Sequence, residues 1–295
     1  MKYWLPLLWL LSAFRADKPA YLFYTQSLKP TSYDALLKQA ADADVVLFGE
    51  LHNNPICHWL ELRLAKDLYA KKKTQLVLGA EMFETDNQSA LTAYASGQTT
   101  SEEFAKQARL WPNYDTDYRP LTDFTREQKI PFVATNAPRK YASLVARQGL
   151  AALDTLPADL KKQLAPLPVT VDLTLPGYKN MLTMMGGDNA HGGNPHGGTT
   201  DQAANFARAQ AIKDATMAHF ILQNWSAGKT VLHLNGAYHS NNFEGISWYL
   251  KQQNPALKIL TVSSVELEDI MKPEKESKDL ANYVLAIPAD MTKTY

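Results

Sequence analysis

Short apolar runs alternate with helical patterns along most of this chain, and the alternation constrains the fold more than any other feature. The continuous apolar character of these runs is typical of strands that are buried on both faces. They span residues 45–48, 76–78, 131–134, 230–234, 259–262 and 283–287. Because helical patterns separate the runs, we expect βαβ units, and therefore an α/β fold with a mostly parallel sheet flanked by helices.

Two stretches depart from this alternation, and we expect them to form a helical cap insertion at the C-terminal edge of the strands. One lies between Asn87 and Gln128 and has helical patterns. The other runs from Ala151 to Arg208, with several prolines first and a glycine-rich loop later. No linker divides the chain, so residues 17–295 are expected to form a single α/β domain.

The N-terminal sequence indicates a targeting segment. Lys2 precedes an apolar run from Tyr3 to Phe14, which is too short to span a bilayer, where about 20 residues are needed. The pattern fits a secretory signal over residues 1–16, so we expect an exported protein, periplasmic or associated with the outer membrane. No cysteine follows the run, and no lipoprotein anchor is expected. The alternative is a hydrophobic helix packed on the domain.

Composition excludes several classes of partner and site. The formal net charge is zero, so no global basic field attracts nucleic acid, and we expect no nucleic-acid partner. The chain has a single cysteine, Cys57, which excludes an intramolecular disulfide and any cysteine-rich zinc site. Cys57 lies early in an apolar helical pattern, which favours a buried structural cysteine over a nucleophile.

Polar and ionisable residues follow four of the predicted strands. In open α/β sheets, ligands bind beyond the carboxyl ends of the strands, so these residues are expected to line one cleft. The residues are Glu50, His52, Asn53, Asn54 and His58 after the first strand, Glu81 and Glu84 after the second, Asn136 and Arg139 after the third, and Asn235, Tyr238 and His239 after the fourth.

Four of these residues, Glu50, His52, Glu81 and His239, are of types that bind a divalent metal or act as general acid and base. We expect His52, Glu81 and His239 to converge on one ion or small polar group. The chain has no H-E-x-x-H zinc motif, no glycine-rich phosphate loop and no G-x-S-x-G nucleophile elbow.

The motif at residues 46–55, Val-Leu-Phe-Gly-Glu-Leu-His-Asn-Asn-Pro, resembles the ChaN haem-binding proteins. Their superfamily also includes the Tiki metalloproteases, TraB-like proteins and erythromycin esterases. Its shared marks are a G-x-x-H after the first strand, a glutamate after the second and a histidine late in the chain. Gly49 with His52, Glu81 and His239 match these marks, and ChaN-like stretches recur at residues 79–84, 136–139, 209–218 and 235–239.

The resemblance implies a protein that binds haem and takes part in haem or iron uptake. Tyrosine, histidine, cysteine and methionine are the usual protein ligands of haem iron. Tyr178, beside a Met-rich stretch, is the first candidate for the axial ligand, and His191 and His196 in the glycine-rich loop are the second. Lys179 or Arg139 is expected to neutralise a propionate. The expected partners are haem, a second copy of the chain in a homodimer, and an outer-membrane haem transport system.

Three functions therefore stay open on the sequence. The first is a haem-binding protein that is not an enzyme, with the strand-end residues in polar or structural roles. The second is a metal-dependent hydrolase, in which Glu50, His52, Glu81 and His239 hold an ion that activates water. The third is a substrate-binding protein without a cofactor. The length of the resemblance, about residues 43–286, favours the first.

Overall fold

A computed structural model describes residues 18–186 and 200–295. The predicted signal segment at residues 1–16, and His191 and His196 in the glycine-rich loop, lie outside the described residues. Within them, no helix is both long enough and apolar enough to cross a membrane.

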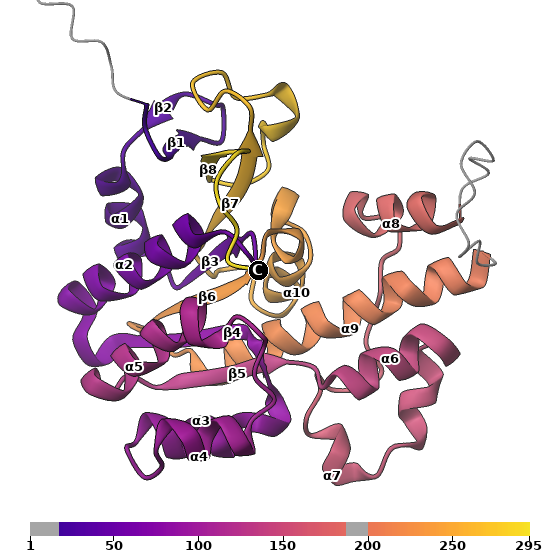
Figure 1. Cartoon of the computed structure of the whole chain (residues 1–295). Coiled ribbons are helices and arrows are strands. Elements are labelled where there is room, and N and C mark those ends of the chain that lie inside the picture. Colours follow the sequence, from indigo (N-terminus) through magenta and orange to yellow (C-terminus); the bar gives the residue numbers. More distant parts are fainter. Residues whose placement is uncertain (1–17, 187–199) are drawn as a thin grey trace, which may run out of the picture.

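The described residues form one sheet of eight strands in the order β2-β1-β8-β7-β3-β6-β4-β5 (Figure 1). Strands β3 to β8 pair with their neighbours in parallel, except where β8 meets β1. β1 runs antiparallel to both of its neighbours, β2 and β8. The predicted α/β fold with a mostly parallel sheet is therefore confirmed. The strands are β1 Leu22–Thr25, β2 Pro30–Thr31, β3 Val45–Glu50, β4 Leu76–Glu84, β5 Phe132–Asn136, β6 Thr230–Gly236, β7 Ile259–Leu267 and β8 Tyr283–Pro288.

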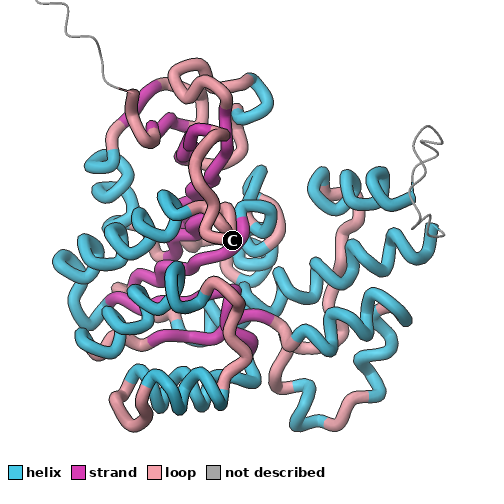
Figure 2. The backbone as a smooth tube through the Cα atoms, viewed as in Figure 1, coloured by secondary structure: helices cyan, strands magenta, loops and turns pink. Residues whose placement is uncertain are grey.

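Helices cover both faces of the sheet, as Figure 2 shows by the cyan segments on either side of the magenta strands. Alternate residues of β3 explain this arrangement, because successive side chains of a strand point to opposite faces. Val46 and Phe48 pack in the cluster that contains α2, whereas Val45 and Leu47 pack in the cluster that contains α9 and α10. The helices are α1 Tyr33–Asp42, α2 Pro55–Lys72, α3 Gln88–Ala95, α4 Ser101–Gln107, α5 Arg119–Gln128, α6 Arg139–Gln148, α7 Ala158–Lys161, α8 Pro176–Gly186, α9 Thr200–Asn224 and α10 Ile246–Gln253.

The helical cap is built mainly from α6 and α8, which pack along α9, with the short α7 beyond α6 (Figure 1). α8 packs on α9 through Tyr178, Met181, Ala207 and Ala211. Helices α3, α4 and α5 of the insert between Asn87 and Gln128 pack beside the sheet, with α3 against β5. Of that insert, the segment around Trp111 and Tyr118 approaches the strand ends, because Trp111 contacts the ring of His52.

A hairpin formed by β1 and β2 was not predicted from the sequence. Its second strand has two residues and includes Pro30, so no alternating pattern marks it. β4 also continues past the predicted run as far as Glu84, with a register shift between Ala80 and Glu84 in its pairing with β5. The irregularity leads the chain out of the sheet at the point where the polar strand ends collect.

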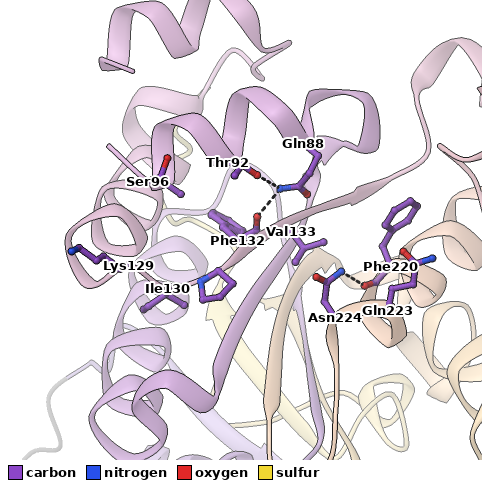
Figure 3. A pocket seen from close by; sticks show the side chains of 12 residues that line it. Gln88, Thr92, Ser96, Lys129, Ile130, Phe132, Val133, Phe220, Gln223 and Asn224 are labelled. Carbon is purple, nitrogen blue, oxygen red and sulfur yellow. Dashed lines mark hydrogen bonds between the residues drawn. The ribbon is translucent and has the colours of Figure 1, made fainter. Parts of the chain in front are cut away.

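The free edge of β5 is capped by one side chain, Gln88 of α3. Its amide nitrogen donates to the carbonyl oxygen of Phe132 at 3.0 Å, and its amide oxygen accepts from the backbone nitrogen of Ala134 at 2.7 Å. Figure 3 shows Gln88 beside Phe132 in a cavity of about 660 Å³ between α3, β5 and α9. Because Gln88 uses its amide to hold the edge strand, we assign this residue a structural role.

Candidate functional site

The carboxyl ends of four adjacent strands meet at one edge of the sheet, as predicted. Gly49 pairs with Asn235 and Glu50 with Gly236 across β3 and β6. Glu84 pairs with Asn136 across β4 and β5. Because the strands are parallel, the residues that follow them project into the same space.

A buried chain of ion pairs crosses this edge. His239 lies between two carboxylates, with its Nε2 at 3.2 Å from Glu81 Oε1 and its Nδ1 at 2.5 Å from Asp214 Oδ1. Glu81 also accepts from the backbone nitrogen of Gly236 at 2.8 Å, and Tyr178 Oη donates to Asp214 Oδ2 at 2.6 Å. Both ring nitrogens of His239 thus face acceptors, which favours the protonated imidazolium.

His52 lies next to this chain at the surface of the site, with its side chain 36% exposed. Its Nδ1 is 2.8 Å from Glu50 Oε1, and its ring meets Trp111 edge to face at 4.9 Å between centroids. A β-carbon added at Gly236 would come within 2.8 Å of His52 Nε2 and 3.6 Å of Glu81 Oε2. The structure therefore brings His52, Glu81 and His239 close together at this edge of the sheet, and their convergence on an ion stays a prediction.

The pKa shifts in this group follow from burial and charge. Burial disfavours the charged forms of both His239 and Glu81, but the carboxylates of Glu81 and Asp214 raise the pKa of His239 to about 10. The pKa of Glu81 is lowered against its own burial, mainly by His239. The hydrogen bond to Glu50 and the charge of Glu81 likewise raise the pKa of His52 against the effect of burial. The positive charge of protonated His239 therefore balances negative charge on the buried carboxylates of this cluster.

Stability is expected to depend on pH through His239. Its folded pKa, about 10, lies above the ordinary value of 6.5. The imidazolium thus contributes stability that is fully present below about pH 6.5 and is lost as pH rises through about 10. We expect the free energy of unfolding to fall by on the order of a few kcal/mol as the pH rises from about 6.5 to about 10, and to fall by less in His239→Gln. Urea unfolding in a chelating buffer measures both proteins. Parallel pH profiles for the two proteins would contradict this prediction.

A cleft opens directly above the cluster and has two connected parts. One part, about 760 Å³, is lined largely by apolar and aromatic side chains. The other, about 880 Å³, is lined by charged side chains. His52, Gln210 and His239 line both parts, so the ion-paired cluster forms the floor where they meet.

Large apolar side chains in the apolar part of the cleft are exposed to solvent. Met184, Tyr238 and Tyr295 are 79%, 49% and 64% exposed, and all three line it together with Phe206 and Met181. Large apolar side chains gathered on one exposed surface are typical of a binding site.

Cationic side chains of α6, α9 and the segment before Trp111 lie in the charged part of the cleft. Arg109 forms ion pairs with Glu84 and Asp86, and Lys140 lies 3.5 Å from Asp86. Arg139 and Lys213 line the same part, and neither has an acidic partner within 4 Å in residues 18–186 and 200–295. The cleft thus offers two uncompensated cations beside an apolar wall.

The residues predicted for haem are divided between different places. Arg139 lines the charged part of the cleft, at the start of α6. Tyr178 is 4% exposed, with its hydroxyl bound to Asp214, while the next residue, Lys179, is exposed on α8. Neither Tyr178 nor Lys179 lines either part of the cleft.

Sequence reasoning gave no role to two residues of the site. Asp214 was noted only within a family-like stretch, although an aspartate in the apolar pattern of a long helix is itself a signal of a buried ion pair. Glu61 was not noted. It lies three residues after His58 on the buried side of α2, and this spacing places both on one helix face.

Comparisons with known proteins bear on the family and the fold. A family model described as haem-binding uptake, Tiki superfamily, ChaN matches residues 36–250. Among solved structures, the chain resembles ChaN of Campylobacter jejuni, described as showing cofacial heme binding, with a TM-score of 0.67, 19% identity and coverage of 90% of this chain and 96% of that chain. An erythromycin esterase mutant in its open conformation gives a TM-score of 0.46 at 11% identity, covering 90% of this chain and 83% of that chain. No curated protein matches.

Proposed function

The chain belongs to the ChaN family of haem-binding uptake proteins in the Tiki superfamily, and from this membership we propose that it binds haem in the cleft at the carboxyl edge of the sheet. The observation that carries the proposal is the division of the cleft into an apolar part and a charged part that holds two cations, Arg139 and Lys213, without an acidic partner within 4 Å in the described residues. Haem has a flat apolar macrocycle with two carboxylates on one side, and such a ligand requires both kinds of surface.

The residues present fit this ligand. Met181, Met184 and Phe206 would contact the macrocycle, and contact there would cover apolar surface that is now exposed. Arg139 and Lys213 would neutralise the propionates, since neither has an ion-pair partner within 4 Å in the described parts of the chain. Lys179 remains a second candidate for a propionate, from its exposed position on α8.

A tyrosine is the proposed axial ligand, because a phenolate suits ferric iron. Tyr178 would have to release Asp214 to ligate, and burial together with the Asp214 charge raises its pKa, which opposes the phenolate. Tyr238 lies in the apolar part of the cleft, half exposed, with its hydroxyl 2.5 Å from the carbonyl oxygen of Gly177. Its position in the cleft makes it the stronger candidate, although burial raises its pKa as well.

Titration with hemin tests both tyrosines. We expect wild type to give a saturable, shifted Soret band, and Tyr238→Phe to lose the shift or weaken binding at least tenfold. Replacing tyrosine by phenylalanine keeps the ring and removes only the ligating oxygen. Tyr33→Phe, which alters a hydroxyl bound to Asp67 on α2, is the matched control.

The outcomes separate the candidates. If Tyr178→Phe alone changes the spectrum, Tyr178 is the ligand, as the sequence analysis predicted. If neither variant differs from wild type, His191 and His196 are the next residues to replace. A wild-type protein that fails to bind hemin would contradict the proposed function.

The same site suggests a homodimer in an uptake role. A haem held by one tyrosine leaves its other face open, and the exposed side chains of Met184 and Tyr295 at the cleft mouth would cover a second copy's ligand. We propose that haem and dimerisation are linked, so that subunit affinity rises with hemin. Export to the periplasm or outer membrane, and transfer to a haem transport system there, are proposed from the N-terminal pattern and the family.

A second candidate function, a metal-dependent hydrolase, is supported by the convergence of Glu50, His52, Glu81 and His239. It would need the ion to replace the proton of His239, because this histidine is now paired with two carboxylates. Metal analysis of wild type beside His52→Ala tests it. Equal metal content in both proteins, or none in either, would favour a polar cluster without an ion.

A further inference from the structure

Beside the cleft, β3 and the first turns of α2 enclose a second group of ionisable side chains, of which Glu50 also lines the apolar part of the cleft. Glu50, His58 and Glu61 are 1%, 6% and 2% exposed. One potential ligand atom from each lies within 4.8 Å of the other two. Among residues 18–186 and 200–295 this is the only such group of histidine, cysteine or carboxylate side chains.

One oxygen of each carboxylate in this group lacks a hydrogen-bond donor in the described part of the chain, and burial together with the nearby Glu50 carboxylate raises the pKa of Glu61. Glu50 Oε1 accepts from Tyr118 Oη at 2.6 Å and is 2.8 Å from His52 Nδ1. Glu50 Oε2 and Glu61 Oε1 have no hydrogen-bond partner within the described residues. An unpartnered carboxylate oxygen in a buried position is costly, so some group must compensate these two atoms.

The orientation of His58 adds a third electron-pair donor. His58 Nε2 lies 3.1 Å from the carbonyl oxygen of His52, and since a carbonyl only accepts, Nε2 carries a proton. In the neutral ring the lone pair is then on Nδ1, which faces Glu61 Oε2 at 3.3 Å and Glu50 Oε2 at 3.8 Å. Three donor atoms therefore converge on one buried point.

The surroundings add negative charge. Asp117 Oδ2 lies 3.4 Å from His58 Nε2, and no lysine or arginine of the described chain comes within 4 Å of Glu50, Glu61 or Asp117. Glu50 is paired with His52, but Glu61 and Asp117 have only His58 as a cationic partner within 4 Å in the described residues, so a dication would compensate buried negative charge here.

We propose that Glu50, His58 and Glu61 bind a divalent transition-metal ion, with Zn²⁺ the best match to one imidazole nitrogen and two carboxylate oxygens. These are ligand types that zinc takes in proteins. Metal-bound histidines almost always donate their other ring N–H to a carbonyl or carboxylate, as His58 does toward His52. This site differs from the strand-end set of His52, Glu81 and His239, where the charges are already paired.

Such an ion would also order the cleft. It would bind Glu50 through Oε2, while Oε1 of the same carboxylate holds the ring of His52. The proton on His52 is then fixed at Nδ1, and Nε2 faces Gly236 and Glu81 at the floor of the cleft. The ion would act as a structural support for His52 and would not itself contact a ligand in the cleft.

The alternative occupant is a proton shared between Glu50 and Glu61, and Glu61→Gln distinguishes the two. Glutamine keeps the shape of a protonated carboxyl, so a shared proton predicts little change. A metal site predicts loss of the ion. Asp67→Asn, six residues farther along α2 and outside the group, is the matched control.

The measurement is Zn²⁺ binding and thermal unfolding of the full chain, carrying His191→Ala and His196→Ala so that the glycine-rich loop cannot bind zinc. We expect about one ion per chain, and a midpoint raised by about 5 °C that a chelator reverses. Glu61→Gln should lose both effects, and Asp67→Asn should keep them.

Three results would overturn the proposal. One is the absence of zinc binding in the folded full chain. Another is a Glu61→Gln variant that binds zinc with the same affinity as the protein without this substitution. The last is zinc binding that Glu81→Gln abolishes and Glu61→Gln leaves intact, since that would assign the ion to the strand-end cluster. Hemin binding is measured separately, so failure here leaves the haem proposal standing.

Discussion

Replacing His239 with alanine is expected to lower the free energy of unfolding at neutral pH by about 3 kcal/mol or more. The side chain is 7% exposed and is the cation between Glu81 and Asp214. Its removal leaves two buried carboxylates without a counter-ion, and breaking a buried pair costs more than the pair contributes. Urea unfolding measures the change.

Two comparisons isolate the charge effect from the loss of packing. His219→Ala removes a half-buried histidine that is bonded to Gln223, and should cost about 1 kcal/mol or less. Adding Glu81→Gln to His239→Ala removes one stranded charge, so the double variant should recover part of the loss. A cost for His239→Ala equal to that of His219→Ala would show that the ion pairs do not stabilise the fold.

Gly49→Ala is expected to destabilise the protein by about 3 kcal/mol, the upper end of the cost of overpacking. An added β-carbon would lie 2.8 Å from Ala237 Cα and 2.8 Å from the carbonyl oxygen of Val262. Both are backbone atoms, one from a neighbouring strand and one from the turn after β6, so neither can rotate away. The glycine of the Gly-Glu-Leu-His motif is thus required by close packing.

Gly177→Ala is the control for this substitution. Its added β-carbon would first meet Glu244 Oε2, at 2.9 Å, which is the end of a flexible side chain. We expect a loss of about 1 kcal/mol or less in urea unfolding. If Gly49→Ala costs no more than Gly177→Ala, the close approach at Gly49 does not limit stability.

The sequence predicted the parallel part of the fold because each buried strand there leaves a continuous apolar run. The run from Val45 to Phe48 has this form, and it is fully buried in β3. β1 and β2 leave no such signal, since the hairpin is short and contains Pro30. Their place at the edge of the sheet depends on pairing with β8, a contact that lies more than 250 residues away in sequence.

The site was predictable where its residues follow strands and not where helices supply them. Glu81 and His239 follow buried runs, so the topology alone brings them to one edge. Asp214 and Glu61 come from the middle of helices, and their burial depends on how α9 and α2 lie over the sheet. Periodicity gives the buried face of a helix, but it does not say which polar residue on that face meets a partner.

Both ends of the sheet resist growth by addition of another strand, which bears on how two copies of the chain can meet. At one end Gln88 bonds the carbonyl oxygen of Phe132 and the backbone nitrogen of Ala134 on the free edge of β5. At the other end β2 is two residues long, and its Pro30 has no N–H. Neither edge is a template for a continuous intermolecular sheet. The homodimer proposed above would therefore have to use side-chain surfaces rather than strand pairing, and the exposed apolar side chains at the cleft, Met184, Tyr238 and Tyr295, offer such a surface.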